Sequence, residues 1–259
     1  GFKELILTGI NAALYGTEQG FVCDIDDTDI ENMHGIEIII HLLDKMPGDF
    51  RIRLSSLEPT AVNSDYVKRL LEYDRLCHHL HLSIQSGSSS IISAMNRNYT
   101  REDYLDIVKV LRDKDLHYGI TTDIIVGFPG ETDEDFADSM NMVREADFLK
   151  VHAFQYSKRK GTAAALMDNQ IEPQIKKSRS AALIAEADRV SKEFMTACTG
   201  EIRQGLFEET DKDKNTGYTD NYIKAYAEAD GKYLNTLCNV KITGLMYDGV
   251  SCEILEEEL

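Results

Sequence analysis

Small and hydrogen-bonding residues follow five apolar segments of the sequence, and these are the residues whose types suit ligand binding. The segments end in Thr8-Gly9-Ile10-Asn11, Ser55-Ser56-Leu57-Glu58, Gln85-Ser86-Gly87, Gly127-Phe128-Pro129-Gly130 and Tyr156-Ser157. If the segments are parallel strands, their carboxyl ends meet at one edge of a sheet and the residues after them line one cleft. A cleft with this lining suits a flat, polar ligand that carries a sugar and an amino acid.

The turn at Gly127-Phe128-Pro129-Gly130 is tight and rigid because two glycines flank a proline. Such a turn lets the backbone approach a bound ligand, and the aromatic ring of Phe128 can pack against it. The same four residues would equally form a strand-to-helix turn that binds nothing. The residue types alone do not decide between the two interpretations.

Cysteine and histidine provide no local metal motif. The five cysteines are Cys23, Cys77, Cys198, Cys238 and Cys252, and no pair of them has C-x-x-C spacing. We expect reduced, structural thiols. The cluster of His78, His79 and His81 could mark a metal site, but the rest of a ligand set is absent. We therefore favour a strand edge with solvent-facing rings.

The elements that must position the cleft alternate between strand and helix up to about residue 198. Strands are expected at residues 4–8, 51–56, 80–84, 119–126 and 149–155, and helices at 36–46, 62–73, 88–95, 100–114, 132–146 and 174–198. Thr100 with Asp103 and Thr132 with Asp135 predict capping boxes. The alternation predicts a parallel α/β sheet, and a closed barrel would need about 250 residues. Residues 1–198 are therefore expected to form a partial (β/α) barrel, with a doubly wound open sheet as the competing architecture.

Residues 199–259 are expected to form a second, small, all-β domain. Their strand-like segments are separated by turn signals at residues 212–217, 230–231 and 248–249. No apolar run in the sequence approaches the roughly 20 residues that span a membrane. We see no signal peptide either, and together with the reduced thiols this predicts a cytoplasmic protein with no membrane partner.

Six segments occur in an order and spacing that resemble the radical S-adenosylmethionine (SAM) methylthiotransferases. They are TGIN, RLSSLEP, LSIQSGS, MNRNYTRE, TDIIVGFPGET and YSKRKGTAAA. The resemblance covers essentially the whole chain, from the family's second barrel strand onward. RLSSLEP and FQYSKRKGTAAALM most resemble the branch that acts on threonylcarbamoyladenosine beside the anticodon of tRNA, and GYTDNYIKAY is similar to that branch's signature in the TRAM domain. The resemblance implies a radical-SAM-type barrel followed by an OB-like TRAM domain.

The resemblance also implies a role for each cleft residue. SAM would contact Thr8, Gly9, Asn11 and Ser55 on one side and Gln85 and Ser86 on the other, and Gly127, Phe128 and Pro129 would approach its adenine. Glu58 and Arg97 would hold the amino and carboxylate groups of its methionine part. Arg97 could instead form a surface ion pair with Glu102 or Asp103.

Two groups of residues are expected to bind tRNA. Lys158, Arg159 and Lys160 form the one dense basic run, and it follows a barrel strand, so it would face the mouth and suit a phosphate. The alternative interpretation of this basic run is a charged turn that faces solvent and binds nothing. Tyr218 and Tyr222, with Asn221 between them, could stack on bases, although aromatic residues on a small β-barrel more often serve packing.

In the family, a [4Fe–4S] cluster reduces SAM to a 5′-deoxyadenosyl radical, a second cluster supplies sulfur, and a second SAM supplies the methyl group. The product carries a methylthio group at C2 of the adenine. The C-x-x-x-C-x-x-C segment and the N-terminal cluster domain have no counterpart in this sequence. We therefore expect a fragment without catalytic or metal-ligating residues, without a cluster or radical activity, and with weak SAM affinity. Its first strand would be an exposed edge through which two copies could pair artefactually.

The net charge of −17 argues against non-specific RNA binding and suits a basic protein partner. A methylthiotransferase that acts on a ribosomal protein is thus an alternative. The basic run and the TRAM-like segment favour tRNA. A third possibility is a non-catalytic RNA-binding module for which the partial barrel serves as a scaffold.

Overall fold

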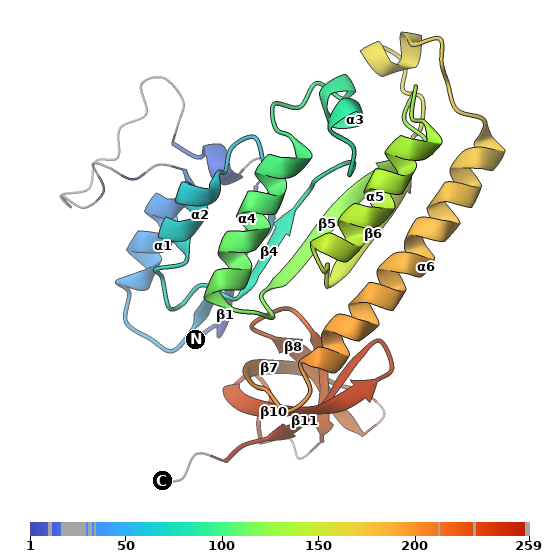
Figure 1. Cartoon of the computed structure of the whole chain (residues 1–259). Coiled ribbons are helices and arrows are strands. Elements are labelled where there is room, and N and C mark those ends of the chain that lie inside the picture. The colour runs from blue at the N-terminus through green and yellow to red at the C-terminus, as the bar shows by residue number, and fades with distance from the viewer. Residues whose placement is uncertain are drawn as a thin grey trace.

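The computed structural model describes residues 1–9, 12–16, 30, 33, 35–211, 213–229 and 232–256. An α/β part with parallel strands stands on a small β-barrel, and the long helix α6 (Pro173–Ala197) runs down to that barrel (Figure 1). The expected Asn11 and Cys23 and the expected turn at residues 230–231 lie outside the described residues. Among the described residues, no helix is long and apolar enough to cross a membrane.

Parallel strands build the α/β part in two open sheets. One pairs β1 (Glu4–Leu7) with β2 (Arg51–Leu54), and the other has the order β3 (Ser56–Leu57), β4 (His79–Leu82), β5 (Gly119–Val126) and β6 (Lys150–Gln155). The parallel sheet is therefore confirmed. The single strand expected at residues 51–56 is divided between β2 and β3, which belong to different sheets.

The helices of the α/β part follow the strands as expected. They are η1 (Ala12–Leu14), α1 (Ile36–Asp44), α2 (Ser64–Leu70), α3 (Ser89–Ala94), α4 (Arg101–Lys114), α5 (Asp133–Glu145) and η3 (Ala163–Leu166), followed by α6. Thr100 and Asp103 form the capping box of α4, and Thr132 and Asp135 form that of α5. Both capping boxes satisfy backbone N–H groups that the first helical turn leaves unpaired.

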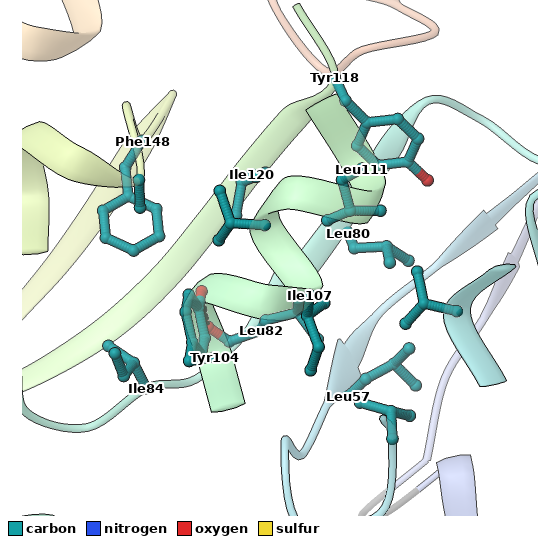
Figure 2. Close-up of a cluster of buried hydrophobic side chains, with 14 of the residues drawn as sticks. Leu57, Leu80, Leu82, Ile84, Tyr104, Ile107, Leu111, Tyr118, Ile120 and Phe148 are labelled. Carbon is teal, nitrogen blue, oxygen red and sulfur yellow. Dashed lines mark hydrogen bonds between the residues drawn. The ribbon is translucent and has the colours of Figure 1, made fainter. Parts of the chain in front are cut away.

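One face of the main sheet carries the apolar core. Leu80, Leu82 and Ile120 point toward the helices, where Tyr104 and Ile107 of α4 cover them (Figure 2). Helices α2, α4, α5 and α6 all contribute to this single cluster. A doubly wound sheet would have helices on both faces, so this arrangement favours the wall of a barrel. We call the opposite side of the sheet the inner face.

The small domain is a closed barrel of five strands in the order β10-β11-β9-β8-β7. Its strands are β7 (Ile202–Asp211), β8 (Lys214–Thr219), β9 (Lys224–Glu228), β10 (Leu237–Met246) and β11 (Gly249–Ile254). The turn expected at residues 212–217 is shorter than predicted, because Asp211 already pairs with Lys214 and residues 214–217 belong to β8. Gly217 serves close packing rather than a turn: a Cβ there would lie 1.8 Å from the carbonyl oxygen of Leu206 on β7.

The histidines of β4 also differ from expectation. His79 is only 3% exposed, and it points to the inner face, where the small barrel covers it. Burial and the nearby Arg53 guanidinium hold the pKa of His79 well below its usual range. The prediction of solvent-facing rings is therefore wrong for this residue. Alternation along a strand predicts which side chains share a face, but it does not predict what packs against that face.

Candidate functional site

A cavity of about 510 Å³ lies at the carboxyl ends of β4, β5 and β6. This volume suits a ligand of cofactor size. Its walls come from the strand ends, the end of α3 and the segment around η3. The lining residues are Gln85, Ala94, Met95, Asn96, Arg97, Ile125, Phe128, Phe154, Gln155, Tyr156, Ser157, Arg159, Thr162, Ala163, Ala164 and Met167. The predicted residues Gln85, Arg97, Phe128 and Arg159 are thus brought together in one place.

The loop after β5 forms one wall of the cavity. Gly127 adopts φ of 71°, a conformation that favours glycine, and its N–H donates to Oε1 of the buried Glu131 at 2.9 Å. The ring of Phe128 meets the ring of Tyr156 edge to face, with centroids 5.3 Å apart. This loop therefore presents an aromatic corner to the cavity on a fixed backbone.

A buried ion pair fastens that loop to α6. Arg179 donates to Oε1 of Glu131 at 2.6 Å and to the carboxylate of Asp133 at 2.6 Å. Burial raises the pKa of Glu131, and the bonds from Gly127 and Arg179 offset part of that effect. Neither Glu131 nor Arg179 was among the predicted site residues, although the segment GFPGET includes the first of them.

Glu58 and Arg97 form an ion pair with each other at the edge of the cavity. Arg97 does not pair with Glu102 or Asp103, so that alternative is wrong. Both side chains keep about a third of their surface exposed, at 32% for Glu58 and 35% for Arg97. A carboxylate and a guanidinium therefore stand side by side where both can still reach a ligand.

The other predicted contacts divide into three groups. Thr8 and Gly9 follow β1 and are exposed, and Ser55 follows β2, where its N–H donates to the carbonyl of Leu7 at 2.9 Å. Gly127 and Pro129 are buried in the loop after β5. None of these five residues lines the cavity itself.

Ser86 has no exposed surface, which corrects its expected contact with a ligand. Gln85 adopts φ of 67°, and this left-handed residue ends the alternation of β4. The side chain of Ser86 then lies under α5, with its Oγ 3.4 Å from that of Ser139, and it accepts the N–H of Ser88 at 3.2 Å. Gln85 keeps its place in the cavity wall.

The residues expected to bind RNA lie at opposite ends of the sheet. Lys158, Arg159 and Lys160 are exposed after β6, at the end that holds the cavity. Tyr218 and Tyr222 belong to the small barrel at the other end (Figure 1). A single RNA contact surface around the cavity would therefore include the basic run alone.

Tyr222 and Asn221 join the small barrel to the inner face. The ring of Tyr222 stacks on His79 with centroids 4.3 Å apart and on Tyr218 at 4.9 Å, and the Arg53 guanidinium lies 5.0 Å from its centroid. Asn221 is fully buried and donates to the carbonyl of His117 at 3.0 Å. Burial leaves Asn221 no surface for a base, which corrects its expected role. Tyr218 remains 38% exposed.

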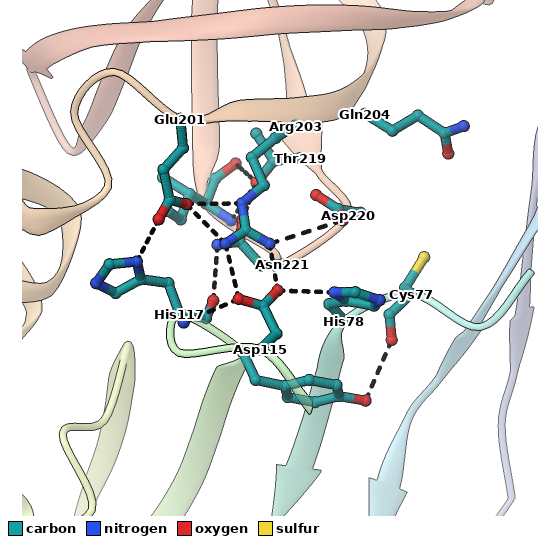
Figure 3. Close-up of polar contacts among 12 residues, drawn as sticks. Cys77, His78, Asp115, His117, Glu201, Arg203, Gln204, Thr219, Asp220 and Asn221 are labelled. Carbon is teal, nitrogen blue, oxygen red and sulfur yellow. Dashed lines mark hydrogen bonds and ion pairs between the residues drawn. The ribbon is translucent and has the colours of Figure 1, made fainter. Parts of the chain in front are cut away.

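A polar network locks the same junction (Figure 3). Arg203 of β7 binds both carboxylate oxygens of Asp115 and also Glu201, while Nδ1 of His78 lies 2.7 Å from Asp115. Burial would raise the pKa of Asp115, but the bonds from His78 and Arg203 hold it well below its usual range. These contacts join residues far apart in sequence, and no sequence pattern indicated them.

His117, Cys198 and Glu201 place one possible metal-ligating atom each within 4.8 Å of one another. The carboxylate of Glu201 is already held by His117 on one oxygen and by Arg203 on the other. Burial raises the pKa of the Cys198 thiol to about 12, which keeps it protonated. The three residues therefore belong to the junction network.

A family model described as the radical SAM superfamily matches residues 2–143. The threonylcarbamoyladenosine tRNA methylthiotransferase MtaB of Bacillus subtilis is 33% identical, over 100% of this chain and 57% of that protein. The tRNA-2-methylthio-N(6)-dimethylallyladenosine synthase of Alkaliphilus oremlandii is 36% identical, over 99% of this chain and 53% of that protein. The chain thus spans about half the length of the curated relatives it matches.

Among solved structures, coproporphyrinogen III oxidase HemN of Escherichia coli, described as a radical SAM enzyme, superposes with a TM-score of 0.50. It is 21% identical and covers 62% of this chain and 38% of its own. At this identity the match concerns the fold alone. It supports the parallel α/β arrangement of the first part of the chain.

Proposed function

Because the chain belongs to the radical SAM superfamily, we propose that the cavity at the carboxyl ends of β4, β5 and β6 binds SAM. The Phe128–Tyr156 corner would receive the adenine, and the Glu58–Arg97 pair would meet the charged methionine part. The SAM-binding roles predicted for Thr8, Gly9 and Ser55, which lie at neighbouring strand ends, belong to the same proposal.

The residues of the cavity fit this ligand. The buried Oη of Tyr156 has no hydrogen-bond partner among the described residues, so the wall keeps a free polar group for a bound molecule. The aromatic corner and the adjacent pair of opposite charges match a molecule with a flat base at one end and a zwitterion at the other. Bound SAM would supply the radical chemistry of the superfamily.

The cysteines of this chain do not fit a [4Fe–4S] cluster. No three of the five have C-x-x-x-C-x-x-C spacing, and among the described ones Cys77, Cys198 and Cys252 are buried. Burial raises the pKa of Cys77 to about 11 and that of Cys252 to about 12, whereas a cluster needs thiolates. The absence of radical activity from this chain alone stays a prediction.

We propose that residues 1–198 are a partial radical-SAM-type barrel and that residues 199–259 are a TRAM-like domain. The end of α6 at Ala197 and the start of β7 at Ile202 support a boundary between them. The closed five-stranded barrel supports an OB-like architecture for the second part.

For the whole protein, we propose methylthiolation of C2 of threonylcarbamoyladenosine in tRNA, next to the anticodon. The observation that carries this proposal is the exposed run of Lys158, Arg159 and Lys160 beside a SAM-sized cavity, in a chain whose relatives are named tRNA methylthiotransferases. A cytoplasmic location agrees with this substrate. The second candidate substrate is dimethylallyladenosine in tRNA, because a relative named for that reaction is 36% identical.

The test is mass spectrometry of tRNA nucleosides from cells that lack the gene encoding this chain. Loss of the methylthio group from threonylcarbamoyladenosine alone would support the proposal. Loss from dimethylallyladenosine alone would move the assignment to the second candidate. An unchanged nucleoside profile would refute both tRNA substrates. It would favour the alternatives, which are a ribosomal-protein substrate and a non-catalytic RNA-binding module.

A further inference from the structure

Polar side chains cover the inner face of the sheet directly below the cavity. Strand register places Ile125 beside Phe154, Asp123 beside His152, and Thr121 beside both His81 and Lys150. Residues two apart in a strand share a face and lie about 6.6 Å apart. The row of Asp123 and His152 therefore follows the row of Ile125 and Phe154, which lines the cavity.

These polar residues form one connected group, which we call the polar strip and define as His81, Ser83, Thr121, Asp123 and His152. Oδ2 of Asp123 accepts the hydroxyl of Ser83 at 2.8 Å and lies 3.3 Å from Nε2 of His81. Nδ1 of His81 lies 2.9 Å from Oγ1 of Thr121. The rings of His81 and His152 have centroids 6.0 Å apart. Asp123 and its neighbours are thus held in a fixed arrangement.

Two members of the polar strip keep binding capacity. Within the described part of the chain, no hydrogen bond reaches Oδ1 of Asp123 or either ring nitrogen of His152. The Asp123 side chain is 29% exposed, and His152 is exposed. Burial would raise the pKa of Asp123, but the bonds from His81 and Ser83 hold it below its usual range. Burial and the nearby Lys150 lower the pKa of His152.

The polar character of this face needs a reason beyond folding. The interior of a packed (β/α) barrel is filled by bulky apolar side chains. Here the inner face carries an ionised carboxylate and three imidazoles, counting His79, and Asp123 and His152 among them keep surface that a ligand can reach. At the far end, Tyr222 covers the strip's neighbour His79 and closes the face. The open stretch therefore lies between the cavity and Tyr222.

We propose that the polar strip binds the target adenine, with Asp123 and His152 as its direct contacts. This inference rests on the proposed function. The free Oδ1 of Asp123 would accept the N–H that an N6-substituted adenine retains, and the neutral ring of His152 would donate to a ring nitrogen. His81 and Ser83 act as positioning residues, because they hold the other oxygen of Asp123. The base would lie one row below the SAM cavity.

The experiment uses this chain and an anticodon stem-loop RNA with N6-threonylcarbamoyladenosine at the position next to the anticodon, called the adenosine RNA. Imidazole resonances of the chain labelled at histidine report on His81 and His152, and fluorescence anisotropy measures the affinity. We expect both resonances to shift with this RNA and to stay unchanged with an otherwise identical RNA that carries uridine at the position. Asp123→Asn should weaken binding of the adenosine RNA about tenfold.

Asp113→Asn, the same change at an exposed site on α4, is the matched control and should leave the affinity unchanged. If Asp123→Asn does not fold, His152→Gln, at an exposed position, tests the same contact and should weaken binding at least threefold. RNA binding that moves neither resonance and tolerates these changes would overturn the inference, whatever the nucleoside profile shows. A chain that binds neither RNA would also overturn it, while a normal nucleoside profile in cells lacking the gene would count against the proposed function itself.

Discussion

The ring of Tyr222, from the small barrel, lies on the ring of His79, from β4, with centroids 4.3 Å apart and planes 26° apart. His79 is buried and its low pKa keeps the ring neutral, so an aromatic face meets an uncharged partner. Arg53 packs on the same tyrosine. This stack closes the end of the inner face that is remote from the cavity and makes the two parts of the chain a single packed unit.

Tyr222→Ala should lower the free energy of unfolding by about 2 kcal/mol, because it removes the stack, the Arg53 contact and part of a packed interface. Urea denaturation measures the loss. Tyr247→Ala is the control, since that ring is 77% exposed and should cost about 0.5 kcal/mol or less. An equal decrease in the free energy of unfolding for the two variants would show that the stack does not join the two parts of the chain.

Asp115→Asn should lower the free energy of unfolding at pH 7 by about 3 kcal/mol, because it removes the carboxylate that pairs with two nitrogens of Arg203 in a buried network and leaves Glu201 as the remaining close partner. The folded-state pKa of Asp115 lies below the unfolded value of about 3.9. Its contribution is therefore complete above that value and fades as the pH falls below it.

Urea denaturation of the wild type and Asp115→Asn at pH 7 and at pH 3 measures this difference. The gap between the two proteins should narrow at the lower pH. Asp113→Asn, in the last turn of α4, should change the free energy of unfolding at either pH by no more than about 0.5 kcal/mol, since Asp113 is exposed. A gap that is the same at both pH values would contradict the assigned role of the carboxylate.

Glu131→Ala should destabilise the protein by about 3 kcal/mol, because Arg179 would then remain buried without this partner and the N–H of Gly127 would lose its acceptor. Amide hydrogen exchange at Gly127 and Phe128 should accelerate as the loop loosens. Glu134→Ala, at an exposed position in the first turn of α5, should change neither the stability nor the exchange rate. Unchanged exchange in Glu131→Ala would mean that the ion pair does not hold the loop.

Replacing Lys158, Arg159 and Lys160 together by alanine should weaken binding of an anticodon stem-loop RNA and make it less dependent on salt. Each lost phosphate contact reduces the slope of log affinity against log salt by about 0.7 to 0.9, so the slope should fall by about 2. Replacing Lys68, Lys109 and Lys114, which are exposed on α2 and α4, removes the same charge elsewhere. If both triple variants lose the same affinity, net charge rather than a local contact governs binding.

Local patterns predicted the regular elements well. The capping boxes of α4 and α5 depend on residues three apart, and β5 is rich in β-branched residues, so both could be inferred from short windows. Of the five segments at strand ends, those after β4, β5 and β6 contribute residues to the cavity wall, whereas the described residues of those after β1 and β2 do not. Gln85, Arg97 and Phe128 do meet there.

Tertiary contacts explain what could not be predicted. His79 is buried because Tyr222, which is far from it in the sequence, stacks on its ring. The sequence of β4 alone does not indicate that contact. Ser86 turns away from the cavity because its neighbour Gln85 adopts a left-handed backbone, which glutamine rarely does. Glu58 and Arg97 were expected to hold separate groups of a ligand, yet in this structure they hold each other.

The most direct test of the account is whether this chain binds SAM in the cavity. Saturation-transfer NMR with titration is suited to the weak affinity expected without a cluster. We predict that SAM binds, that the signal of its adenine is the strongest, and that Phe128→Ala and Arg97→Ala each weaken binding about tenfold, while Arg189→Ala on the exposed face of α6 does not. Absence of SAM binding at millimolar concentration, or binding that is unchanged in both cavity variants, would contradict the assignment of the site.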